Sequence, residues 1–369
     1  MSVLSAIPVE TRLAAAPVPL PTTGKDLATF RRALLRWYDQ HRRDLPWRKT
    51  RDPYRVWLSE IMLQQTRVAA VLDHYRIFLE RFPNIQALAA ASEEAVLAAW
   101  SGLGYYRRAR MLHQCAKDLA QKYDGRFPQS SEALQRLPGI GRYTAAAIAS
   151  IAFDEPAAVV DGNVWRVLQR LMGTKLIGTK MTGINLVTPQ TWQQAQALLA
   201  ISRPGDFNQA MMELGATVCV PREPRCLVCP VWKWCVTRGE IPRTESPSRQ
   251  ERKQIWCALE QCDGNGRGHS KVRLVQRPRR APLMPSMWEL PQSSKPPRSL
   301  PAAEHWRTFR HSITVTNYTV HVVRNVSLPN TLLPGARQPA KGKWIAVERI
   351  AQIPITGLTR KILKAGGII

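Results

Sequence analysis

The chain has 369 residues, an apolar content of 44% and a formal net charge of +26. This length suggests two or three domains, and the apolar content is ordinary for globular proteins with a sizeable core. The charge favours a polyanionic partner, nucleic acid before an acidic membrane surface. No segment has the roughly 18 uninterrupted apolar residues of a membrane span, so we expect no membrane-spanning helix.

The N-terminus has neither the cationic start nor the continuous apolar core of a secretory signal. We expect residues 1–25, which are rich in Pro and Ala, to form a disordered tail. Without export the protein is expected inside the cell, in the cytoplasm at the nucleoid if its source is prokaryotic. Disulfides are rare in that reducing compartment, where clustered cysteines more often bind metal.

Hydrophobic periodicity divides the chain into two kinds of structure. Apolar residues recur at helical spacing from residue 26 to about 218, between Gly and Pro turns, which predicts an all-α domain over 26–240. The polar stretch 241–253 is typical of a linker. The β-branched, partly alternating segments that follow, with a short helix at "TRKILKA", predict a smaller α+β domain over 254–369.

Glu60 is the charged residue of the apolar stretch "VWLSEIML". Burial among apolar neighbours raises a carboxyl pKa, and such a group can act as a general acid near neutral pH. The alternative is a structural Glu paired with an Arg. Asp161, in "VVDGNVWRVL", precedes a helical pattern and suits an N-cap, where helix amides favour the ionised form. A carboxyl biased towards the protonated form and another biased towards the ionised form together suit cleavage of a glycosidic bond.

The stretch "LPGIGRYTAAAIASIAF" predicts two helices joined by a Gly-rich turn. Gly139 and Gly141 allow a sharp turn and a close approach to a ligand, and the amides that open the second helix can hold a phosphate. An ordinary turn is the alternative. The flanking helices and the basic charge favour a DNA-backbone clamp of the helix-hairpin-helix type.

Four of the seven cysteines lie within seventeen residues, with the spacing C-x6-C-x2-C-x5-C. They are Cys219, Cys226, Cys229 and Cys235. Zinc sites usually have two close pairs and this segment has one, whereas iron–sulfur clusters accept four thiolates at varied spacings. The residues themselves leave zinc and a cluster open.

Together and in this order, these elements resemble the helix-hairpin-helix DNA glycosylases that carry an iron–sulfur cluster, and within them the adenine DNA glycosylase family. The similar segments are "LPWR", "DPYRVWLSEIMLQQTRV", "GLGYYRRAR", "LPGIGRYTA", "VDGNVWRVL", "FNQAMMELGATVC" and the cysteine spacing. "PLMPSMWELP" and "KWIAVERI" are similar to that family's Nudix-like domain, which reads 8-oxoguanine in the opposite strand. The Glu-rich Nudix hydrolase helix is missing, so we predict no second hydrolase.

The resemblance implies a role for each matching residue. The quartet at 219–235 would ligate one [4Fe–4S] cluster per chain. Glu60 would protonate the flipped adenine and Asp161 would stabilise the cationic sugar. Tyr143 and Asn163 would line the same pocket, and Arg48 and Gln209 would contact the adenine. The residues that would enter the duplex as a wedge beside the lesion are Gln65, Thr66, Leu103 and Tyr105. The partner would be duplex DNA with adenine opposite 8-oxoguanine or guanine, and the protein a monomer.

Two positions bear on specificity. Related glycosylase-lyases of the endonuclease III type have a Schiff-base lysine where this chain has Tyr143, and that chemistry needs an amine. We therefore predict a monofunctional glycosylase. The family's recognition loop typically has Phe-Ser-His after a histidine, whereas His311 is followed here by "SITVT". Thr314 keeps a hydroxyl for the lesion and Ile313 replaces the aromatic, so preference for 8-oxoguanine is expected to be weaker or built differently.

Two competing interpretations remain at this point. One is a bifunctional glycosylase-lyase for oxidised pyrimidines with the same fold, which Tyr143 and the C-terminal domain oppose. The other is a non-catalytic DNA-binding protein with a structural metal. Glu60 inside an apolar run opposes that interpretation, because a buried carboxyl without a partner is costly unless it serves a purpose.

Overall fold

The structure is a computed structural model. It describes residues 24–173, 187–239, 251–262, 270–297, 305–313, 316–324, 326, 328 and 342–369. Contacts divide the chain into two compact units: residues 1–44 with 149–245, and residues 45–148 with 246–369. This division differs from the predicted domains at 26–240 and 254–369, whose boundaries stay a prediction. No described helix is both long and apolar enough to span a bilayer.

The first unit is built from four helices, the second half of α8 and the cysteine loop. The helices are α1 (Gly24–His41), α9 (Gly162–Met172), α10 (Pro189–Leu198) and α11 (Pro204–Thr217). Arg43, which follows α1, makes a bidentate ion pair with the fully buried Glu213 of α11, with nitrogen–oxygen distances of 2.8 and 2.7 Å. α1 begins at Gly24, and residues 1–23 of the predicted tail lie outside the described residues.

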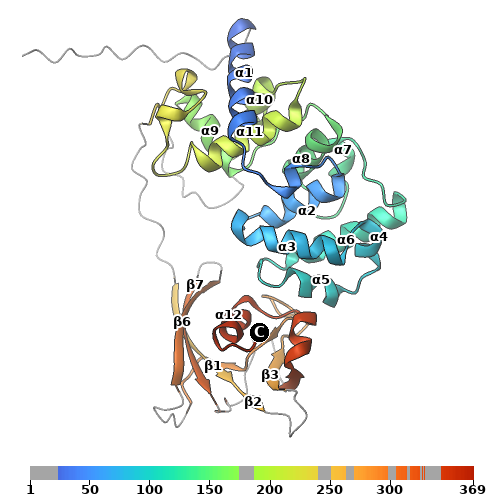
Figure 1. The fold of residues 1–369 in the computed structure, drawn as a ribbon, viewed down its shortest axis with the longest axis vertical. Coiled ribbons are helices and arrows are strands. Elements are labelled where there is room, and N and C mark those ends of the chain that lie inside the picture. The colour runs from blue at the N-terminus through green and yellow to red at the C-terminus, as the bar shows by residue number, and fades with distance from the viewer. Residues whose placement is uncertain are drawn as a thin grey trace, which may run out of the picture. The chain divides into compact units, whose positions relative to one another are not determined.

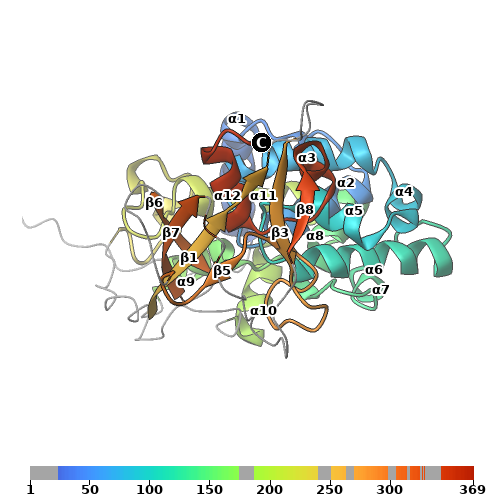
Figure 2. The ribbon, with the colours of Figure 1, turned by 90° about the horizontal axis from the view of Figure 1, so that it is seen from below.

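The second unit begins with a run of helices that carries the Glu60 segment and the Gly-rich turn. They are η1 (Pro46–Arg48), α2 (Pro53–Leu63), α3 (Val68–Arg81), α4 (Ile85–Ala90), α5 (Glu93–Trp100), α6 (Arg107–Lys122), α7 (Ser131–Leu134) and the first half of α8 (Arg142–Phe153). Pro53 occupies the first turn of α2, and Asp52 caps it by accepting from the Tyr54 amide at 2.9 Å. The segment from Pro53 to Arg81 forms two helices, α2 and α3, and Figure 2 shows α4 beside α6 in the same unit.

Strands make up most of the C-terminal part, and the first three residues of β1 fall in the stretch expected to be a linker. One sheet has the order β5-β1-β7-β6 and the other contains β2, β3, β4 and β8, with β8 paired to β3. Their bounds are β1 (Glu251–Leu259), β2 (Gln261–Cys262), β3 (Lys271–Gln276), β4 (Trp288–Glu289), β5 (Gln292–Ser293), β6 (His305–Ile313), β7 (Thr316–Arg324) and β8 (Lys343–Ala346). β1 and β7 are parallel over nine residue pairs, and β6 runs antiparallel to β7.

The core of this α+β part lies between the sheets and α12 (Gly357–Ala365), the short helix predicted near the C-terminus (Figure 1). Thr356 caps α12, and Ile362 and Leu363 are fully buried among strand residues. A buried ion pair, Arg277 with Glu289 at 2.9 Å, joins the loop after β3 to β4. The sequence pattern predicted β1, β3, β7 and α12 but not β6, whose alternation is weak because its side chains are mostly half-buried or exposed.

Candidate active site

Glu60 lies on the buried side of α2 and is 7% exposed. The Tyr143 hydroxyl, from the first turn of α8, donates a hydrogen bond to Glu60 Oε2 at 2.6 Å. The two residues are 83 positions apart in sequence, and both belong to the second unit. The carboxyl therefore sits in an apolar helix surface with its orientation set by a phenol.

Asp161 is the N-cap of α9, as predicted. Its Oδ1 accepts from the Val164 amide at 2.7 Å, and its Oδ2 accepts from Asn163 Nδ2 at 3.0 Å. Asn163 is itself fixed by Arg166, whose Nη2 donates to Asn163 Oδ1 at 2.9 Å. Asp161 is thus held by its own helix and by a neighbouring amide.

The cap position of Asp161 predicts a carboxyl that ionises easily, but its environment raises its pKa. Burial raises the pKa of the Asp161 carboxyl, and this outweighs the hydrogen bonds from Val164 and Asn163 and the Arg166 charge, which lower it. The helix N-terminus favours the ionised form, but the loss of hydration around the half-buried Asp161 side chain outweighs that effect. The sequence shows the cap and not this loss of hydration.

The same hydrogen bonds lead from Asp161 to the cysteine loop within the first unit. Arg166 Nε donates to the Cys219 carbonyl at 2.9 Å, and its Nη2 also donates to the Gly215 carbonyl at 2.7 Å. α9 and α11 approach closely because Gly215 has no side chain, and an added Cβ would lie 2.7 Å from Asn163 Cβ. Arg166 therefore ties Asn163 to the first cysteine of the quartet.

A second arginine of α9 holds the loop itself. Arg170 donates to the carbonyls of Val220 and Pro221 at 2.8 and 2.7 Å and to Cys219 Sγ at 3.3 Å. Cys235 Sγ lies 3.3 Å from the Arg170 carbonyl. Both ends of the quartet are thereby anchored to one residue of α9.

The four thiols influence one another. Burial raises the pKa of Cys229 to about 12, and Cys219, Cys235 and Cys226 add to the rise because neighbouring thiolates repel. All seven cysteines of the chain are free thiols. No group of three or more His, Cys, Asp or Glu side chains in the described part of the chain is arranged to hold a single metal ion. As thiolates they would repel one another, and a bound cationic group would relieve that repulsion.

The Gly-rich turn between α7 and α8 has the predicted backbone. Gly139 has a φ of +75°, and an added Cβ would come within 2.7 Å of Met111 Cβ, so both conformation and space require glycine. Gly141 has open space around its Cα, and its carbonyl accepts from the Ala145 amide in the first turn of α8. α7 is shorter than the "SEALQRL" segment expected before the turn, ending at Leu134.

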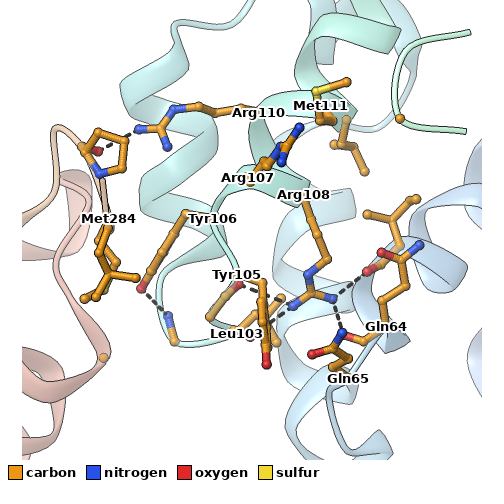
Figure 3. A pocket seen from close by; sticks show the side chains of 18 of the residues that line it. Gln64, Gln65, Leu103, Tyr105, Tyr106, Arg107, Arg108, Arg110, Met111 and Met284 are labelled. Carbon is orange, nitrogen blue, oxygen red and sulfur yellow. Dashed lines mark hydrogen bonds between the residues drawn. The ribbon is translucent and has the colours of Figure 1, made fainter. Parts of the chain in front are cut away.

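Several predicted DNA-contacting residues line one pocket of about 1010 Å³ in the second unit. Those residues are Gln65, Leu103, Tyr105, Gly139 and His311. Figure 3 shows Gln65 and Tyr105 on neighbouring loops, with Met284 on the other side of Tyr106. The second wall of the pocket includes Leu283, Met284, Pro285, Ser312 and Ile313. The pocket therefore combines the predicted wedge with the start of the predicted recognition loop.

The wedge candidates differ in exposure. Tyr105 is 51% exposed and Leu103 is only 5% exposed, so in this state Tyr105 presents the larger accessible side chain. Thr66 is half-buried, and its hydroxyl donates to the Gln64 carbonyl at 3.2 Å. His311 is half-buried on β6, and burial and then Lys361 lower the pKa of its imidazole, which favours the neutral ring.

The remaining predicted residues are not part of that pocket's lining. Arg48 is half-buried at the end of η1, just before α2, and Gln209 is half-buried on α11 in the first unit. Thr314 lies outside the described residues. The structure thus brings Glu60 together with Tyr143, and Asp161 with Asn163, in different units.

Comparisons with known proteins agree with these features. Residues 58–185 match the HhH-GPD superfamily of base excision DNA repair proteins. An adenine DNA glycosylase from Rattus norvegicus is 36% identical, covering 92% of this chain and 78% of its own. The Homo sapiens adenine DNA glycosylase is 48% identical over 60% of this chain and 41% of its own.

The chain belongs to the adenine DNA glycosylase family.

Among solved structures, a thermostable thymine-DNA glycosylase is similar with a TM-score of 0.53 and 30% identity, covering 58% of this chain and 97% of that one. The adenine-specific DNA glycosylase predicted from sequence is therefore confirmed, as is the helix-hairpin-helix fold of its helical part, followed by an α+β region. The enzyme cleaves N-glycosyl bonds in base excision repair.

Sequence reasoning missed two arginines of the site, Arg166 and Arg108. Both are half or more buried, and each donates to several backbone carbonyls from distant segments. The available signal was an arginine on an otherwise apolar helix face in "VWRVL", and no such signal marks Arg108. Their role depends on contacts that sequence spacing does not encode.

Proposed function

We propose that this adenine glycosylase acts on adenine mispaired with 8-oxoguanine or guanine in duplex DNA, as a monomer. The observation that carries the mechanism is the buried Glu60 carboxyl held by Tyr143 at 2.6 Å. A carboxyl so placed suits a general acid. The target bond is inaccessible inside the stack, so the adenine must first be extruded.

Glu60 gives its proton to the imidazole ring of the flipped adenine. The C1′–N9 bond then breaks with its electron pair leaving on the base, and the sugar becomes oxocarbenium-like. Tyr143, by holding Glu60 Oε2, orients the carboxyl for this transfer. Arg48 and Gln209 contact the adenine.

Asp161 supplies the anion that stabilises the cationic sugar until water adds at C1′ and loses a proton. Its raised pKa means that Asp161 ionises less readily than an ordinary Asp, and Asn163 offsets part of that rise. A buried anion close to developing positive charge stabilises it strongly, because little water screens the interaction.

The opposite base is read in the pocket lined by Gln65, Tyr105 and His311. Ile313, also in that lining, replaces the family's aromatic and can contribute only apolar contact. Thr314 adds a hydroxyl. The C-terminal part serves as a Nudix-like recognition domain without hydrolase activity, and selectivity for 8-oxoguanine over guanine is correspondingly modest.

The cysteine quartet holds one [4Fe–4S] cluster. Cys219, Cys226, Cys229 and Cys235 would supply thiolates, and the bound cluster would supply positive charge and a rigid link between them. Arg166 and Arg170 position the loop against α9, and the loop's own Arg222 and Arg225 are available for DNA phosphates. The cluster's role is structural and DNA-positioning.

A base-release assay on four duplexes tests the function. Each carries adenine opposite 8-oxoguanine, guanine, cytosine or thymine and is analysed with and without alkali. We expect strand cleavage only after alkali, fastest opposite 8-oxoguanine and next opposite guanine. Cleavage without alkali would instead indicate a lyase, and equal rates on all four duplexes would refute mismatch specificity.

Replacing one quartet cysteine should remove the cluster. Cys229→Ser is expected to abolish the broad visible absorbance of the purified protein and to lower its melting temperature, because three thiolates cannot complete the site. Cys262→Ser, outside the quartet, is the matched control and should keep the colour. A colourless wild-type protein that contains stoichiometric zinc would refute the cluster.

Removing the Asn163 amide should shift the pH profile. Asn163 Nδ2 lowers the pKa of Asp161, so Asn163→Leu should raise that pKa further. The active form is the anion, and activity should therefore fall at a higher pH than in the wild type as the solution is acidified. The measurement is kcat/KM against pH. A lower plateau with an unmoved acid limb would mean that Asn163 serves only in packing.

A further inference from the structure

Arg108, on the first turn of α6, closes the C-terminus of α2. Its Nη1 donates to the carbonyls of Ile61, Met62 and Gln64 at 2.7, 3.0 and 2.6 Å. The last carbonyls of a helix have no partner within the helix, and a cation there also interacts favourably with the helix dipole. Arg108 therefore fixes the point at which the chain leaves α2 for Gln65.

The other nitrogen of the same guanidinium holds a second loop. Arg108 Nη2 donates to the Leu103 and Gly104 carbonyls at 3.1 and 3.3 Å and to Thr66 Oγ1 at 3.1 Å. Trp100, fully buried, adds a bond from its Nε1 to the Gly104 carbonyl at 3.2 Å. Figure 3 shows the guanidinium between the two loops, with bonds to both.

Each loop carries a side chain on a strained backbone. Gln65 has a φ of +54° and Tyr105 a φ of +46°, in the left-handed region that residues with a side chain rarely adopt. Both side chains are exposed and line the same pocket. Such backbone persists only where the surroundings over-determine it, and six hydrogen bonds from one residue do so here.

Two aromatic rings also hold the Arg108 guanidinium, in addition to its hydrogen-bond acceptors. Its guanidinium carbon lies 5.4 Å from the centre of the Trp100 ring and 5.5 Å from that of Tyr105. Burial lowers its pKa to about 10, which still leaves it protonated at neutral pH. The residue is thus a permanent cation that faces backbone carbonyls.

We propose that Arg108 is a positioning residue that holds Gln65 and Tyr105 as a paired wedge, so that extrusion of adenine depends on it without its contacting the base. This inference rests on the proposed function, in which these two side chains enter the duplex. Extrusion costs unstacking energy, and a wedge whose tips are fixed in advance loses less entropy when it enters the stack. Arg108 sets the spacing of the two tips because it bonds to the backbone of both loops.

The test compares two substrates that differ in the cost of extrusion. Both contain adenine opposite 8-oxoguanine, one in a fully paired duplex and the other with mismatches flanking the adenine. Arg108→Met is expected to lower the single-turnover rate by about 10- to 100-fold on the paired duplex, as misplacement of about 1 Å can. On the mismatch-flanked duplex the loss should be less than about fivefold, because stacking there is already weak.

A spectroscopic measurement separates positioning from general destabilisation. With 2-aminopurine in place of adenine, wild-type enzyme at saturation should raise the fluorescence as the base unstacks, and Arg108→Met should raise it much less. Arg108→Lys keeps the charge but replaces a planar fork with a point cation, and should remain defective on the paired duplex. Trp100→Phe removes the bond to Gly104 and shrinks the ring beside the Arg108 guanidinium, in a side chain that cannot reach DNA. This variant should lose more activity on the paired duplex than on the mismatch-flanked one, by a smaller factor than Arg108→Met.

Arg76→Met is the charge-matched control. Arg76 is exposed on α3 and pairs with Glu80. Its loss should therefore lower the single-turnover rates on the two duplexes only slightly and by the same factor. If Arg108→Met fails to fold, as judged by circular dichroism, Trp100→Phe carries the test. Equal losses on both duplexes with a full 2-aminopurine signal would overturn the inference alone. A wild-type enzyme that releases adenine from no duplex would overturn the proposed function and this inference with it.

Discussion

Asp161→Asn is expected to reduce base release by about 10³-fold or more while leaving DNA binding unchanged, a loss at the upper end of those seen when one preorganised charge-stabilising group is removed. The asparagine oxygen can still accept from the Val164 amide, so the cap of α9 is kept. What disappears is the negative charge opposite the cationic sugar. The measurement is single-turnover release of adenine opposite 8-oxoguanine, together with the Kd for the same duplex.

The matched control for that change is Asp52→Asn. Asp52 is also an N-cap aspartate, on α2, but it is exposed and accepts from the Tyr54 amide at 2.9 Å. This variant should retain wild-type rates, because it too keeps a capping oxygen and loses only an exposed ion pair with Arg55. If Asp161→Asn kept more than about a tenth of the wild-type rate, the electrostatic role assigned to Asp161 would be wrong.

Glu60→Gln is expected to lower base release by about 10² to 10⁴-fold, the range of general acid catalysis. The amide keeps the shape of the side chain and can still accept from the Tyr143 hydroxyl, but it has no proton to give to the adenine. Affinity for the mismatch should be unchanged. The rate of base release should be measured from pH 5 to 9. The variant should also lose any part of the pH–rate profile that reports the titration of Glu60.

Two further variants sharpen this prediction. Glu80→Gln removes an exposed carboxylate of α3 that pairs with Arg76, and it should behave as wild type. Tyr143→Phe leaves Glu60 in place without its 2.6 Å hydrogen bond and should give an intermediate rate. Normal turnover by Glu60→Gln would transfer the acid role to another group and would remove the main support for the mechanism.

Local sequence was sufficient wherever a short segment decides the outcome. The Asp161 cap and the Gly139 turn both follow from a few adjacent residues, because capping and turn geometry are local. The change from helices to strands near residue 251 was predicted for the same reason. The short strands β4 and β5, each of two residues, were not, because pairing with distant partners creates them.

The candidate site shows the same division. Its residue types were predicted from the stretches around Glu60, Asp161 and the cysteines, and family membership confirms the enzyme they indicate. The contacts between these residues were not predicted from sequence. Tyr143 donates a hydrogen bond to Glu60 across 83 positions, and Arg166 joins Asn163 to Cys219. Asp161 also has a raised pKa where its cap position suggested a charged group.

The amino-acid sequence is enough to establish the chemistry available to this protein: two carboxyls, a thiol quartet, a Gly-rich hairpin and a large positive charge. These are properties of single residues and short spacings. The fold alone shows that Asp161 loses hydration and that one guanidinium, Arg108, supports two loops 37 or more residues apart in the chain. Burial and long-range hydrogen bonding depend on which segments pack together, and that is a property of the whole fold.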